Sequence, residues 1–115
     1  MSKRRTEELL EDIKEAAGRI GKYIRGMDYQ AFLGDLKTQD AVVRNVEIIG
    51  EAVKKLPKAF TAKYAGIPWK EMAGTRDKLI HDYFGVNYDI LWNIAKNELP
   101  GILEAMGKLP MEGGK

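Results

Sequence analysis

The chain has 115 residues with 19 Lys or Arg, 17 Asp or Glu and a single His, which gives a formal net charge of +2. This length and composition predict one globular domain over residues 1–115, with frayed ends at 1–5 and 110–115. The chain has no Cys and a single His, which excludes disulfides, a cysteine nucleophile and a thiolate or multi-histidine metal site from one chain, and we expect no metal and no cofactor. It also has no signal-like or membrane-spanning apolar run, which predicts a cytoplasmic protein.

The first predicted helix runs from about Thr6 to Gly26. Its apolar residues recur at three- and four-residue spacing, which is typical of an amphipathic helix. Thr6 is predicted to cap this helix and Gly26 to end it. Asp28 is then in position to cap a short helical turn that ends at Leu33.

The second long predicted helix runs from about Thr38 to Leu56 and ends before Pro57. Its apolar residues cover more than one stripe, which predicts contacts with two neighbouring helices. Gly50 lies inside this helix at a cost of about 1 kcal/mol relative to Ala. A close approach of another helix is the expected compensation.

Arg44, Glu47 and Glu51 form a charged row on this second helix. Spacings of three and four residues place such side chains on one helical face, where they form ion pairs in solvent. A solvated face and a row that lines a functional groove both account for the pattern, and the sequence leaves both open.

The rest of the chain is predicted to form one short helix, a third long helix and a fourth helix that contains a proline. A short helix covers Lys58–Tyr64, and Ile67-Pro68-Trp69 begins a third long helix that continues to about Tyr83. Asn87 caps a fourth helix, which Pro100 bends or breaks. The predicted fold is an all-α, mostly up-and-down bundle of four to five main helices with short connections.

The third long helix carries the candidate site residues. Arg76 projects into its apolar stripe, so the guanidinium must be paired or line a cavity, unless its stem crosses apolar surface to reach a surface carboxylate. His81 is five residues later, about 140° around a straight helix, so the two side chains meet only if the helix end distorts or two copies share the site. Asp77, four residues before His81, can orient the ring. A terminal His that only interacts with the helix dipole is the plainer interpretation.

The run Arg76-Asp77-Lys78-Leu79-Ile80-His81-Asp82-Tyr83 resembles the signature of HEPN-domain proteins, small helical bundles with an Arg, a polar residue and a His a few positions later. The Tyr two residues after the His resembles the HepT branch, the toxin half of the HepT/MntA toxin–antitoxin systems. Further segments resemble HepT proteins in the same order, over roughly Thr6 to Leu103: Asp40–Asn45, Ile48–Ala52, Ile67–Trp69 and His81–Val86.

This resemblance implies a homodimeric HEPN-type bundle and a metal-independent endoribonuclease in which the Arg–His motifs of two chains face one cleft. Arg76 would bind and polarise the scissile phosphate, His81 would act as general acid or base, and Asp77 would orient the site. Tyr83 resembles the tyrosine that an MntA-like nucleotidyltransferase antitoxin modifies with AMP, the alternative being a core aromatic. The implied partners are RNA, a second copy of the chain and this antitoxin, with no membrane.

Other residues carry weaker signals. Lys78 and Lys70 either contact the RNA backbone or are solvated. Trp69 and Trp92 either stack on bases or pack in the core or a dimer. An alternative function is a non-catalytic nucleotide- or partner-binding subunit of a nucleotidyltransferase complex. A structural helical dimer without a ligand would need Arg76 to be fully paired within its own chain.

Overall fold

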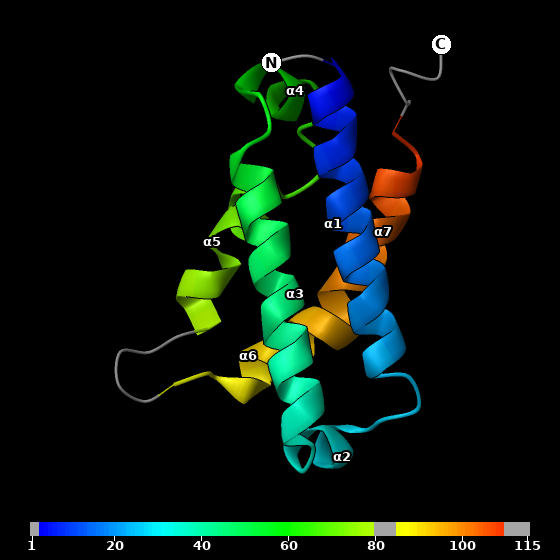
Figure 1. The fold of residues 1–115 in the computed structure, drawn as a ribbon, viewed down its shortest axis with the longest axis vertical. Helices are drawn as coiled ribbons and strands as arrows, with labels where there is room; N and C mark the ends of the chain where they lie inside the picture. Colours follow the sequence, from blue (N-terminus) through cyan, green and yellow to red (C-terminus); the bar gives the residue numbers. More distant parts are fainter. Residues whose placement is uncertain (1–2, 80–84, 110–115) are drawn as a thin grey trace.

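The computed structural model describes residues 3–79 and 85–109, which form helices and their connections, with no β-strand among them. In chain order the helices are α1 (Lys3–Tyr23), α2 (Tyr29–Leu33), α3 (Leu36–Lys54), α4 (Lys58–Lys63), α5 (Trp69–Leu79), α6 (Tyr88–Asn93), the π-helix η2 (Ile94–Glu98) and α7 (Leu99–Gly107). The chain runs down α1, up α3, down α5 and up again through α6, η2 and α7 (Figure 1). This arrangement confirms the predicted all-α, up-and-down bundle.

Side-chain caps begin three of the helices. Asp28 and Asn87 cap α2 and α6 as predicted, by accepting hydrogen bonds from the backbone amides three residues later at 2.8 Å and 3.1 Å. Asp35 caps α3 in the same way, and the hydrogen bond from the Thr38 amide holds the pKa of its carboxyl below the ordinary value. The helix therefore begins at Leu36, two residues before the predicted start at about Thr38, because Asp35 caps it.

Helix α1 begins earlier than predicted. It starts at Lys3, and Thr6 lies within it and is buried, so the predicted cap at Thr6 is wrong. Thr6 shares the buried face of the helix with Leu9 and Ile13, at the three- and four-residue spacing of one stripe. Helix α1 ends at Tyr23, three residues before the predicted end, and the turn that follows it includes Gly26 at φ 78°, a left-handed conformation that favours glycine.

Helix α3 lies at the centre of the bundle and packs on both α1 and α5, which confirms the predicted contact with two neighbours. Its buried residues belong to the same core as the apolar stripe of α1 and the buried side of α5. None of the helices in the described ranges is long and apolar enough to cross a membrane.

The predicted close helix approach at Gly50 is confirmed. Gly50 is buried in α3 against the backbone of α5, where a Cβ atom would lie 3.5 Å from the carbonyl oxygen of Ala73 and 3.6 Å from that of Met72. These distances are ordinary van der Waals contacts, so the position has room for one methyl group.

The C-terminal helical run passes Pro100 without a break. Pro100 has no amide hydrogen, and its ring would clash with the carbonyl of the residue four positions earlier in a regular α-helix. Residues 94–98 form a π-turn, in which the Leu99 amide donates to the Ile94 carbonyl, five residues back. The helix therefore widens before Pro100, and α7 follows with the proline in its first turn. At the place where Pro100 was predicted to bend or break the helix, the chain changes from π-helix to α-helix.

The third predicted helix is described only in part. Helix α5 begins at Trp69, directly after Pro68, and is described to Leu79. The predicted continuation to Tyr83 falls on residues 80–84, which lie outside the described residues.

We expect Gly50→Ala to leave the free energy of unfolding unchanged or to raise it by up to about 1 kcal/mol, because the methyl group fits and Ala is the better helix former. Gly50→Leu should lower it by about 1–3 kcal/mol, because the larger side chain pushes α3 and α5 apart. Urea unfolding followed by circular dichroism measures both. A Leu variant as stable as the parent chain would contradict the close approach.

Candidate functional site

The side chain of Arg76 connects the two helices on which the site is built. Arg76 lies in the last turn of α5, and its Nε donates a hydrogen bond to Oε2 of Glu47 on α3, at 3.0 Å. The arginine side chain is 56% exposed and the glutamate side chain 29%. Arg76 is therefore not buried in an apolar stripe: it reaches a surface carboxylate, as in the alternative left open by the sequence.

The guanidinium of Arg76 keeps two of its nitrogens available. The hydrogen bond to Glu47 uses Nε, and Nη1 and Nη2 have no protein partner within residues 3–79 and 85–109. An arginine held at Nε still presents the fork of its terminal nitrogens, which matches two oxygens of a phosphate or carboxylate. The condition for a purely structural Arg76, full pairing within its own chain, is not met in the part of the chain that the structure describes.

Glu47 also faces a second arginine. Its other oxygen, Oε1, lies 4.0 Å from Nη1 of Arg44, three residues earlier on α3. The Arg44 side chain is 72% exposed, the most of the three. One carboxylate thus lies between two guanidinium groups that both reach solvent. The third member of the predicted charged row, Glu51, is exposed and has no ion pair among the described residues.

The structure brings only some of the predicted site residues together. Arg76, Asp77 and Lys78 are consecutive and exposed at the end of α5. Lys70 is exposed near the other end of α5, six residues before Arg76 and therefore about 9 Å from it along the helix axis at 1.5 Å per residue. His81 falls outside the described residues, and so does the predicted modification site, Tyr83.

The two tryptophans pack within the fold. Trp69 is buried, packs against Phe60 with the two rings tilted, and donates its indole N–H to the Tyr64 carbonyl at 3.0 Å. Trp92 is half-buried and packs on Phe32, with ring centroids 5.1 Å apart. For both residues the packing interpretation accounts for the observed contacts.

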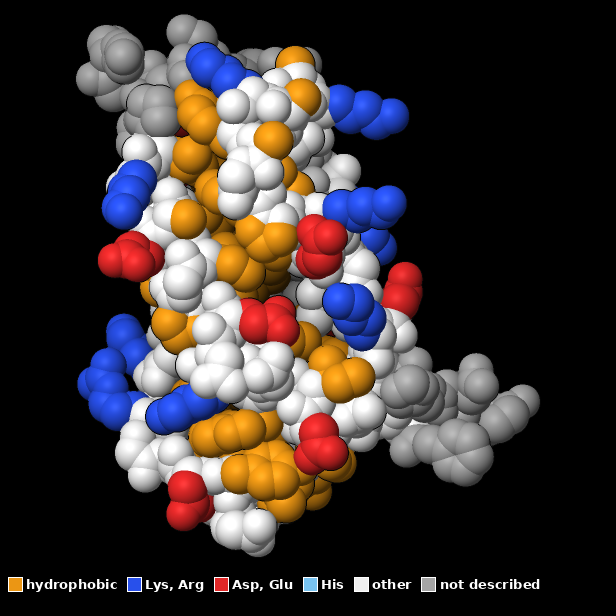
Figure 2. Space-filling view, turned by 180° about the vertical axis from the view of Figure 1, so that it is seen from behind, with side chains coloured by type: hydrophobic (Ala, Val, Ile, Leu, Met, Phe, Trp, Pro, Cys, Tyr) orange, Lys and Arg blue, Asp and Glu red, His pale blue; other side chains and the backbone are white. Residues whose placement is uncertain are grey.

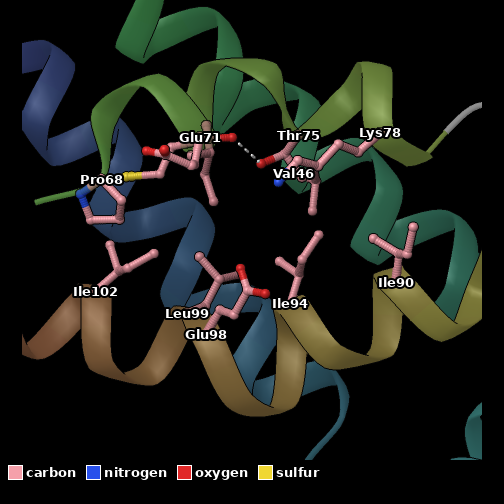
Figure 3. A pocket seen from close by; sticks show the side chains of 12 residues that line it. Val46, Pro68, Glu71, Thr75, Lys78, Ile90, Ile94, Glu98, Leu99 and Ile102 are labelled. Atoms are coloured by element: carbon pink, nitrogen blue, oxygen red, sulfur yellow. Dashed lines mark hydrogen bonds between the residues drawn. The ribbon is translucent and has the colours of Figure 1, made fainter.

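A pocket of about 260 Å³ lies between α5 and the run from α6 to α7, and Val46 and Ile49 of α3 also line it. Figure 2 shows this face of the molecule, with a band of hydrophobic side chains between charged ones. In Figure 3, α5 lies above the pocket and the run from α6 to α7 lies below it. The lining residues are Val46, Ile49, Pro68, Glu71, Met72, Thr75, Lys78, Ile90, Ile94, Glu98, Leu99 and Ile102.

Polar groups gather at the edge of this otherwise apolar pocket. Glu71, Thr75 and Lys78 follow one face of α5, and Glu98 faces them from η2 (Figure 3). Glu98 accepts a hydrogen bond from the Asn93 side chain at 2.8 Å, and the Thr75 hydroxyl donates to the Glu71 carbonyl oxygen. An apolar cavity with a few polar groups at its mouth is the usual form of a small-molecule site.

Glu47 is the site residue whose role the sequence did not reveal. The spacing of Arg44, Glu47 and Glu51 indicated a charged row but gave no sign that Arg76, 29 residues away in the chain, would join it. The available signal was Gly50, one turn from Glu47, because a close helix approach there places the next turn of α5 beside Glu47. Within the described ranges no group of His, Asp and Glu side chains is arranged to hold a metal ion.

A family model and named relatives both show similarity to ribonucleases of one family. A family model described as "Ribonuclease HepT-like" matches residues 13–109. The chain is 47% identical to "Probable ribonuclease HepT" of Thermococcus cleftensis, over 93% of this chain and 97% of the relative. It is 46% identical to a Methanocaldococcus jannaschii protein named "Putative RNase", over 95% of this chain and 90% of the relative. No solved structure gives a significant match.

We expect Arg76→Ala and Glu47→Gln each to change the free energy of unfolding by less than about 1 kcal/mol, because solvent-exposed ion pairs contribute little to stability. Met72→Ala, one turn away in the core, is the matched control and should cost about 2–5 kcal/mol. Urea unfolding measures all three. A loss of several kcal/mol for Arg76→Ala would show that this ion pair mainly stabilises the fold.

Proposed function

The chain belongs to the HepT-like ribonuclease family, and on this basis we propose that it is a metal-independent endoribonuclease whose active site forms across a homodimer. The observation that carries the proposal is the exposed side chain of Arg76, anchored at Nε by Glu47, whose terminal nitrogens have no protein partner within residues 3–79 and 85–109. This is the arrangement that a phosphate-binding arginine requires. The second residue of the proposed site is His81, whose role is inferred from the resemblance of the Arg76–His81 segment to the HEPN signature.

The proposed chemistry uses the nucleophile that RNA itself carries. The 2′-hydroxyl attacks the adjacent phosphorus and loses its proton to a general base, while the bond to the 5′-oxygen breaks and a general acid protonates that oxygen. His81 is the residue proposed for proton transfer, because an imidazole titrates near neutral pH. Arg76 is proposed to bind the phosphate and stabilise the charge that develops on it. Asp77 is proposed to orient the site.

A second copy of the chain completes this mechanism. One chain has a single His, whereas the reaction needs both a base and an acid. In a homodimer, two His81 side chains supply both groups, and two Arg76 side chains face the same RNA strand. Of the two lysines, Lys78 is the better placed for contact with the RNA backbone, because it lies two residues from Arg76, whereas Lys70 lies near the far end of α5.

We further propose that the protein is the toxin of a toxin–antitoxin pair and is neutralised when a cognate nucleotidyltransferase transfers AMP to Tyr83. Tyr83 is two residues after His81 in the sequence. AMP on its hydroxyl adds a bulky group with a negative phosphate close to the residues proposed to bind RNA. That phosphate would compete for the guanidinium of Arg76 and repel the RNA backbone.

The pocket beside α5 favours a second candidate function. A non-catalytic subunit that binds a nucleotide for a nucleotidyltransferase would need an apolar cavity with polar groups at its mouth, and the pocket between α5 and η2 has that form. Nucleotide affinity that survives His81→Ala, in a protein that leaves RNA intact, would favour this function over the ribonuclease.

Arg76→Ala and His81→Ala should each abolish cleavage of RNA and inhibition of growth, because the first removes the phosphate-binding group and the second removes the proton-transfer group. Cleavage is measured on total RNA with purified protein in the presence of EDTA. Both variants must keep the oligomeric state of the parent chain, measured by light scattering. If the unmodified parent protein leaves every RNA intact, the endoribonuclease proposal fails.

Incubation with the cognate nucleotidyltransferase and ATP should raise the intact mass by whole AMP units and abolish cleavage, because the modified tyrosine blocks the site. Peptide mapping should locate the addition at Tyr83, and Tyr83→Phe should gain no mass. Tyr88, the next tyrosine along the chain, gives the matched control Tyr88→Phe, which should still be modified. Modification at another residue, or none, would contradict the proposed regulation.

A further inference from the structure

We propose that Arg44 is a second phosphate-binding residue, which contacts the RNA phosphate next to the one bound by Arg76, and that Glu47 is the positioning residue that aligns both guanidinium groups. The inference rests on the proposed ribonuclease function and adds an RNA-binding subsite on α3. The residues that carry it are all described in the structure and lie on two packed helices.

The geometry places one carboxylate between two arginines. Oε2 of Glu47 accepts from Nε of Arg76 at 3.0 Å, and Oε1 lies 4.0 Å from Nη1 of Arg44. Side chains three residues apart on a helix have Cβ atoms about 5–6 Å apart, so Arg44 and Glu47 are neighbours on α3. Both guanidinium groups are therefore next to the carboxylate of Glu47, each nearer to a different one of its two oxygens.

Both arginines have donors to spare. Arg44 is 72% exposed and Arg76 is 56% exposed, and within residues 3–79 and 85–109 neither has a protein partner other than Glu47. Exposed ion pairs of this kind add little to folding stability. Their contribution to the fold does not explain the cluster, whereas a row of guanidinium forks toward solvent matches the oxygens of successive phosphates.

The negative charge of Glu47 makes two possible roles of the cluster distinguishable: positioning of the arginines and general electrostatic attraction for RNA. Two arginines and one glutamate leave a net charge of about +1, so Glu47 weakens the attraction for RNA. If the cluster acted only through its charge, removing that carboxylate would improve binding and cleavage. If Glu47 holds Arg76 and Arg44 in the orientation that the reaction needs, removing it preserves the attraction and slows the reaction. Glu47→Gln separates the two cases.

Binding of RNA without cleavage tests the role of Arg44. The probe is a single-stranded oligonucleotide with 2′-O-methyl groups, which cannot be cleaved because it lacks the nucleophile. For Arg44→Ala we expect an affinity about two- to fivefold lower, as for the loss of one exposed ion pair, and a salt dependence whose slope falls by about 0.7, the value for one phosphate contact on a single strand. Arg25→Ala is the matched control, because Arg25 is exposed and takes part in none of the ion pairs among the described residues.

Cleavage kinetics test the role of Glu47. For Glu47→Gln we expect a kcat about tenfold lower and a KM that is unchanged or lower, because the attraction for RNA remains while the alignment is lost. Glu51→Gln removes the same charge one turn along α3, from an exposed residue without an ion pair among the described ones, and should leave kcat unchanged. Glu47→Asp keeps the charge and should recover part of kcat.

Each outcome decides the proposal. A salt slope for Arg44→Ala equal to that of Arg25→Ala overturns the second phosphate contact. A kcat for Glu47→Gln equal to or above that of the parent chain overturns the positioning role. A parent chain that never cleaves RNA overturns the positioning role of Glu47 together with the proposed function. The phosphate contact of Arg44 is still decided in that case, because the non-cleavable probe measures it without cleavage.

Discussion

The close approach of α3 and α5 at Gly50 determines where the charged groups of the candidate site lie. The two helices run in opposite directions, so three residues back along α3 correspond to about three residues forward along α5. Gly50 faces the backbone of Met72 and Ala73, and the same register brings Glu47 beside Arg76. A bulky side chain at position 50 would separate the helices, and the glutamate would no longer reach the guanidinium. A packing feature of the core thus sets the geometry of an ion pair at the surface.

Local features of the fold could be predicted from the sequence, because their causes are local. An Asp or Asn before an apolar run caps a helix through its own side chain, and Asp28 and Asn87 do so. The cap assigned to Thr6 was wrong for the same reason: a capping residue type marks a possible helix start, and α1 continues through it to Lys3. Pro100 marked the place where the helix changes type, but the helical run does not break there: it widens into a π-turn before the proline.

The candidate site was harder to predict, because its contacts join distant parts of the chain. A helical projection gives the direction in which Arg76 points. It gives neither the distance to the neighbouring helix nor the identity of the residue on that helix that Arg76 contacts. For this reason the sequence suggested a buried arginine, and the structure has one that is 56% exposed and paired with Glu47. The link between Arg76 and His81 came from resemblance to a family, and it stays a prediction because His81 lies outside the described residues.

A net charge of +2 on 115 residues is too small to produce a strong overall attraction for RNA. Recognition of a phosphate by such a protein must then depend on where a few guanidinium groups point. A carboxylate between two arginines lowers the local positive charge, which is a disadvantage for attraction alone. The carboxylate is an advantage if it restricts the orientations of the two arginine side chains before RNA binds. Less conformational entropy is then lost when the RNA is bound. The position of Glu47, with one oxygen toward each arginine, is consistent with this second role.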